Sequence, residues 1–166
     1  MRRIMLIDDE IYVLRSLHRL LVRHFPGDAV RIELFDDPRE ALLWAGEHSF
    51  DLAISDYRMA RMDVVTLLKQ LRDIQPETVR MIVSGAADQA VLIDAINKAQ
   101  IYRFIAKPWG NDELVAAVRD ALRLHDGLRE QRQIADELHE NSGAAPHADD
   151  HAGDAMPIPS GANCTP

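Results

Sequence analysis

The sequence predicts an α/β fold in which a doubly wound parallel sheet carries helices on both faces. One observation is the alternation of five short apolar runs with five segments of helical character, which is the pattern of repeated strand–helix units. A second is the first run, residues 3–7, whose apolar stretch Ile4–Ile7 lacks the polar alternation of a half-exposed strand. Such unbroken runs are expected where helices cover both faces of a sheet.

Each element is predicted from its own local signal. Residues 10–24 carry apolar side chains at helical spacing, and Pro26-Gly27-Asp28 ends that helix. Asp37 is a suitable N-cap before Pro38, which opens the second helix. The predicted strands are residues 3–7, 30–35, 51–55, 79–83 and 102–106. The predicted helices are residues 10–24, 38–47, 63–73, 88–99, and a last one that is capped by Asn111 or Asp112 and runs past Leu124.

The bulk composition limits the class of protein. The 166 residues suit one domain with an appended segment, and 47% hydrophobic residues are enough for a core. A net charge of −8 argues against nucleic-acid binding through phosphate contacts. There is no apolar run of about 18 residues, so we expect no membrane span. The start is too short for a signal peptide and Cys164 is the single cysteine, so we expect a cytoplasmic protein without an internal disulfide.

Polar side chains close four of the predicted strands. Asp8 and Asp9 follow the first, Asp56 the third, Ser84 the fourth and Lys107 the fifth. The carboxyl ends of parallel strands form the ligand-binding edge of such a sheet. Gathered carboxylates repel one another and favour a cation, and an all-oxygen site with room for water suits Mg²⁺. A lysine beside them suits an anionic group, so these residues indicate a phosphoryl-transfer site with a carboxylate as acceptor.

Four segments around these positions resemble the receiver domain of bacterial two-component response regulators. They are Ile7–Glu10, Ser55–Asp63, Val83–Ala86 and Phe104–Trp109. The resemblance covers roughly the first 125 residues, so we expect a receiver domain at 1–125. It implies a flavodoxin-like (CheY-like) five-stranded parallel sheet with the strand order 2-1-3-4-5.

The resemblance also implies roles at the acidic end of the site. Asp56 matches the phosphoacceptor, which takes a phosphoryl group from a phosphohistidine. Asp9 and Asp56 match direct Mg²⁺ ligands, the backbone carbonyl of Arg58 matches a third protein ligand, and Asp8 matches a residue that acts through water. Taken alone, Asp56 also reads as a strand-end residue that caps the following turn, and Asp8 or Asp9 as an N-cap.

Three further positions match functional residues of the family. Ser84 matches the hydroxyl that binds a phosphoryl oxygen, and Lys107 matches the lysine of the family pattern, whose bond to the following proline, here Pro108, is cis in the family. X–Pro bonds are the ones where the cis form costs little. Phe104 matches the switch aromatic that turns inward with Ser84 on activation, and a partly buried core aromatic describes it equally well.

Two positions depart from the family pattern. Ala60 stands where Pro is usual, and Val64 stands where Gly is usual. Gly is favoured where the backbone needs a positive φ, and a β-branched residue is poorly tolerated there. The sequence therefore predicts either a different loop path or local strain after Asp56.

Beyond the receiver, the sequence predicts a helical extension at 126–140 and a disordered tail at 141–166. Met156 and Ile158 are the only large apolar side chains of the tail, which cannot offset the entropy of ordering it. The last helix carries a heptad-like seam, formed by Leu114, Ala117, Ala121, Leu124, Leu128, Gln131, Ala135 and Leu138. Two interpretations stay open: a coiled coil, or a core face followed by a frayed linker.

These features predict a stand-alone receiver, not a turnover enzyme, that is switched by Mg²⁺-dependent phosphorylation of Asp56. A sensor histidine kinase or a phosphotransfer protein would supply the phosphoryl group. We expect output through contact with an unidentified protein, or a homodimer, at the face of helix four, strand five and helix five. The alternative is a phosphorylation-independent receiver that acts as a dimerisation or scaffold module. A flavin protein is disfavoured, because the segment 9–12 lacks a hydroxyl-rich phosphate loop.

Overall fold

The computed structural model describes residues 1–25, 27, 29–85 and 99–142. These ranges contain, in chain order, β1 (Arg2–Ile7), α1 (Ile11–His24), β2 (Val30–Phe35), α2 (Pro38–Glu47), β3 (Leu52–Asp56), α3 (Val64–Ile74), β4 (Val79–Gly85), β5 (Arg103–Lys107) and α5 (Asn111–Ser142). The helix predicted at 88–99 lies outside the described residues apart from Ala99, and so does the predicted tail from residue 143 onward.

All five strands form one parallel sheet with the order β2-β1-β3-β4-β5. This confirms the predicted fold class and strand order. Ile7 at the end of β1 pairs with Ser55 of β3, and Asp56 pairs with Val83 of β4. The register therefore brings the carboxyl ends of the strands together at one edge of the sheet.

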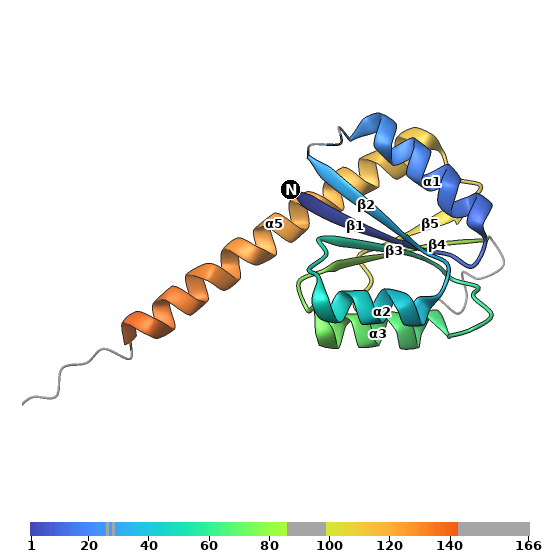
Figure 1. Cartoon of the computed structure of the whole chain (residues 1–166). Helices are drawn as coiled ribbons and strands as arrows, with labels where there is room; N and C mark the ends of the chain where they lie inside the picture. The colour runs from blue at the N-terminus through green and yellow to red at the C-terminus, as the bar shows by residue number, and fades with distance from the viewer. Residues whose placement is uncertain (26, 28, 86–98, 143–166) are drawn as a thin grey trace, which may run out of the picture.

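The strands bury side chains on both faces, which explains their unbroken apolar runs. In β1, Ile4 and Leu6 belong to one core, whereas Met5 and Ile7 belong to the other. The first core lies between the sheet and helices α1 and α5, and the second between the sheet and helices α2 and α3 (Figure 1). The side-chain period of two along a strand produces this division.

Two helix starts carry a side-chain cap, whereas the N-cap of α1 is Glu10 without a side-chain hydrogen bond, so neither Asp8 nor Asp9 is its N-cap. The Asp37 carboxylate accepts a hydrogen bond from the Arg39 N–H at 2.9 Å, with Pro38 at the first position of α2. Asp63 caps α3 in the same way, accepting from the Thr66 N–H at 2.9 Å. In α5 the structure differs slightly from the prediction, because Asn111 is already the first helical residue rather than its cap.

Val64 does not strain the backbone. It is the first residue of α3, and its side chain is fully buried in the core beneath α2 and α3. Within the described ranges, Gln100 is the only non-glycine residue with a positive φ, at 50°. The strain expected from a valine at this position is therefore absent, and the loop reaches α3 without a left-handed residue there.

Helix α5 is one continuous helix of 32 residues whose second half projects from the domain (Figure 1). The first half of the predicted seam is buried in the core, namely Leu114, Ala117 and Ala121. The second half is exposed: Leu128 to 37% and Leu138 to 64%. The first half is thus a core face, and the second half continues as helix to Ser142 rather than as a frayed linker. No helix in the described ranges has the length and apolarity to cross a bilayer.

Candidate functional site

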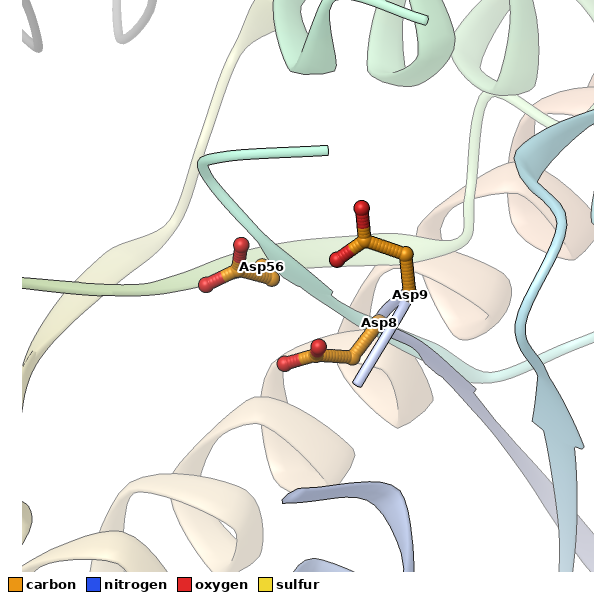
Figure 2. A group of neighbouring side chains, drawn as sticks. All are labelled: Asp8, Asp9 and Asp56. Atoms are coloured by element: carbon orange, nitrogen blue, oxygen red, sulfur yellow. The ribbon is translucent and has the colours of Figure 1, made fainter. Parts of the chain in front are cut away.

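Three carboxylates meet at the carboxyl edge of the sheet. Asp8 and Asp9 follow β1 and Asp56 ends β3, and one carboxylate oxygen from each lies within 4.8 Å of the others (Figure 2). Asp8 and Asp56 are buried, with 2% and 7% exposure, whereas Asp9 is exposed to solvent. The sequence prediction that these residues gather at one edge is therefore correct in its geometry.

Lys107 bridges the two buried carboxylates. Its Nζ donates to Asp56 Oδ1 at 2.6 Å and to Asp8 Oδ2 at 3.1 Å. Burial lowers the pKa of Lys107, but the hydrogen bond to Asp56 and the charges of Asp8 and Asp56 together outweigh it, so the Lys107 pKa is raised. The lysine is therefore a firmly charged cation directly beside the Asp56 carboxylate.

Asp8 responds differently to the same contact. Burial is the largest influence on its carboxyl group and raises the pKa; the Glu10 N–H and Lys107 lower the pKa, the nearby charge of Asp56 raises it, and the net shift is upward. Three carboxylates facing one ammonium leave an excess of two negative charges when all are ionised. Such an excess of oxygen ligands fits a divalent cation.

Main-chain donors hold the remaining carboxylate oxygens. Asp8 Oδ1 accepts from the Glu10 N–H at 2.8 Å, so this side chain also braces the entry to α1. Asp56 Oδ2 accepts from the Arg58 N–H at 2.7 Å. Arg58 thus lies with its main chain at the cluster, where its carbonyl was predicted to act as a ligand.

The two predicted switch residues lie on neighbouring strands. Ser84 is buried in β4, one residue beyond the position that pairs with Asp56. Phe104 lies further back on β5, beside Ile82, and is half-buried against the core beneath α2 and α3. The Lys107–Pro108 peptide bond is cis.

Sequence reasoning missed two contacts of the β3–α3 loop, residues 57–63. The Ala60 N–H donates to Asp9 Oδ2 at 3.0 Å, and the Arg61 guanidinium contacts Asp37 Oδ2 at 2.8 Å. The Ala60 contact uses the main chain, which carries no sequence signal. Arg61 resembles any exposed loop arginine, so nothing in the sequence singled it out.

Comparisons with known proteins agree with this geometry. The family model for the response regulator receiver domain matches residues 4–119. The chemotaxis protein CheY of Bacillus subtilis is 31% identical over 120 residues, which cover 72% of this chain and 97% of CheY. A crystal structure of the signal receiver domain of an HD domain-containing protein from Pseudomonas fluorescens has a TM-score of 0.71 at 32% identity, covering 78% of this chain and 92% of that one.

The chain is also similar to part of a longer relative. The hydrogenase transcriptional regulatory protein HoxA of Bradyrhizobium diazoefficiens is 31% identical over 140 residues, which is 84% of this chain. The chain spans only about a quarter of HoxA, 28% in this organism and 24% in Cupriavidus necator. This chain belongs to the response regulator receiver domain family and is a homologue of the receivers of two-component signalling.

Proposed function

We propose that this chain is the phosphoacceptor receiver of a two-component or phosphorelay pathway and that Asp56 is the residue phosphorylated. The observation that carries the proposal is the contact between Asp56 and Lys107, 2.6 Å long, within a cluster that also holds Asp8 and Asp9. The phosphoryl donor would be a phosphohistidine of a sensor histidine kinase or a phosphotransfer protein. The chain then performs its own half of the transfer and is not a turnover enzyme.

In this reaction a carboxylate oxygen of Asp56 attacks the phosphorus of the phosphohistidine. The new P–O bond forms an acyl phosphate, while the P–N bond breaks and its electron pair returns to the donor's imidazole. Negative charge on the phosphoryl oxygens has to be neutralised during transfer. Lys107 provides one positive charge, and the Ser84 hydroxyl would donate a hydrogen bond to a phosphoryl oxygen.

The acidic cluster would supply the metal site that this chemistry requires. Asp9, Asp56 and the main-chain carbonyl of Arg58 would hold Mg²⁺ directly, and Asp8 would act through water. Mg²⁺ bound there supplies positive charge that Lys107 alone does not provide. The excess of negative charge and the solvent exposure of Asp9 support this assignment.

Phosphodonor labelling tests the proposal. The protein is incubated with Mg²⁺ and acetyl phosphate, and the intact mass is measured. We expect one phosphoryl group per chain on the wild type and none on Asp56→Asn. Asp63→Asn serves as the matched control, because Asp63 follows the same strand but caps α3 and lies outside the cluster. Equal labelling of Asp56→Asn would exclude Asp56 as the acceptor.

For the output, we propose a dimer along the projecting half of α5. Leu124 and Leu128, which follow the last core residue of the helix, Leu122, are exposed to 39% and 37% and lead into that half. Phosphorylation would act through Ser84 and Phe104 on the face formed with β5. The helix predicted at 88–99 would complete this face, and all of it except Ala99 lies outside the described residues. Sedimentation with and without beryllium fluoride, on wild type and on Leu124→Asp with Leu128→Asp, tests this arrangement.

The rival function is a phosphorylation-independent dimerisation or scaffold module. The exposed leucines of α5 favour it, because they need no phosphoryl group to pair. A dimer that forms equally in wild type and Asp56→Asn, without any labelling, would support the rival. A cytoplasmic location belongs to the leading proposal and is expected for either function.

A further inference from the structure

The contact between Ala60 and Asp9 connects the β3–α3 loop to the proposed metal site. The Ala60 N–H donates to Asp9 Oδ2 at 3.0 Å across 51 residues of sequence. The neighbouring Arg61 binds Asp37, which also caps α2 through the Arg39 N–H. Arg61 therefore links the loop to the chain segment that follows β2, directly beside the Ala60 amide that contacts Asp9.

Asp9 needs such a contact to stay in the cluster. Its carboxylate is exposed, unlike those of Asp8 and Asp56, so it is the one with solvent-filled space to turn into. Like charges within 4.8 Å repel one another, and this repulsion favours a rotamer of Asp9 that points away. A hydrogen bond from a main-chain amide opposes that rotation, because the loop itself is anchored.

We propose that the Ala60 main-chain amide is a positioning donor, which aims the Asp9 carboxylate at the cation. The inference rests on the proposed Mg²⁺-binding function of the cluster. One hydrogen bond to Oδ2 leaves the other oxygen available as a ligand, and one oxygen of Asp9 points toward Asp56 while the other points away (Figure 2). Donors behind a ligating carboxylate typically raise metal affinity by about 10–100-fold.

The chemistry of residue 60 makes this inference specific to the present chain. Any residue except proline has the required N–H, so the methyl group of Ala60 is dispensable. Proline, the residue usual in the family pattern at this position, lacks the donor. Ala60→Pro therefore removes the contact, whereas Ala60→Ser changes the side chain and retains the contact.

Calorimetric titration with Mg²⁺ tests the inference on the full chain without any phosphodonor. We expect Ala60→Pro to raise the Mg²⁺ dissociation constant about tenfold, and Ala60→Ser to leave it within about twofold of wild type. Wild-type affinity in Ala60→Pro overturns the positioning role while the proposed function stands. Absence of Mg²⁺ binding in the wild type overturns both.

Amide hydrogen exchange gives a second reading that does not depend on the proline variant folding. We expect the Ala60 amide to be protected in the wild type, to lose protection in Asp9→Ala, and to remain protected when Mg²⁺ is added. Thr66, whose N–H donates to the Asp63 cap, provides an internal reference that Asp9→Ala leaves unchanged. Loss of Ala60 protection on adding Mg²⁺ means that the metal displaces the donor, and it overturns the inference.

Discussion

Replacing Asp9 by alanine should separate the stability of the fold from its response to metal. One carboxylate oxygen of Asp9 lies within 4.8 Å of one oxygen of Asp8 and one of Asp56. At this distance each like-charge pair costs roughly 1–3 kcal/mol for effective dielectric constants between about 80 and 20, and the exposure of Asp9 favours the lower figure. Asp9→Ala relieves this repulsion, but it also removes the hydrogen bond from Ala60, which contributes about 1 kcal/mol.

The two effects have opposite signs and similar size, so the metal-free stability of Asp9→Ala should stay within about 1 kcal/mol of wild type. Mg²⁺ breaks this balance. A ligand that binds only the native state at about 100 times its dissociation constant stabilises the fold by about 2.7 kcal/mol. We expect this gain in the wild type and little of it in Asp9→Ala.

Urea unfolding with Mg²⁺ or with a chelator, at matched ionic strength, measures both quantities. Asp73→Ala is the control, since Asp73 is an exposed acidic residue that pairs with Arg72 at the far end of α3. It should retain the full Mg²⁺-dependent shift. An equal shift in Asp9→Ala and wild type would refute the reasoning, because the cation would then bind elsewhere.

Three further outcomes follow from the structure. Lys107→Met should destabilise the metal-free protein by about 3 kcal/mol in urea unfolding, because it leaves two buried carboxylates without their cation. The pKa of Asp37 lies below its usual 3.8, chiefly because the Arg39 N–H binds the carboxylate. The ionised Asp37 carboxylate therefore stabilises the fold at neutral pH, and this contribution is lost as pH falls through the lowered pKa. Asp37→Asn should remove that acid-dependent part in unfolding curves measured from pH 6 down to about 2. Removing residues 143–166 should leave unfolding cooperative and phosphodonor labelling intact, since that segment has almost no apolar surface to contribute.

The parts of the fold that were predictable are those with local causes. Asp37 before Pro38 marks a helix start through capping chemistry, and the structure has the helix there. The unbroken apolar run Ile4–Ile7 predicts a strand that is buried on both faces of the sheet. In the structure its alternate residues belong to two different cores. Each signal lies within a few consecutive residues, so it can be recognised without the tertiary structure.

The convergence of the site residues was predictable for a related reason, but the predicted site lacked one contact. Strand ends in a parallel sheet share one edge, so Asp8, Asp56 and Lys107 had to converge once the strands were assigned. The Ala60–Asp9 contact depends on the path of the loop and on a main-chain group that every non-proline residue possesses. The backbone conformation of Val64 likewise depends on where α3 begins. Because Val64 is the first helical residue, its φ is not positive and the valine is not strained.

The seam along α5 shows why periodicity alone left two interpretations open. Spacing of three and four residues places side chains on one face whether that face meets its own domain or another helix. Ala117 and Ala121 satisfy the pattern inside the domain, and Leu128 and Leu138 satisfy it in solvent. Arg132 contacts Glu77 at 2.9 Å, so the projecting half is tied at its root to the loop that precedes β4. A helix whose base is fixed to the sheet presents its exposed leucines in one direction, which is the geometry that pairing with a second helix requires.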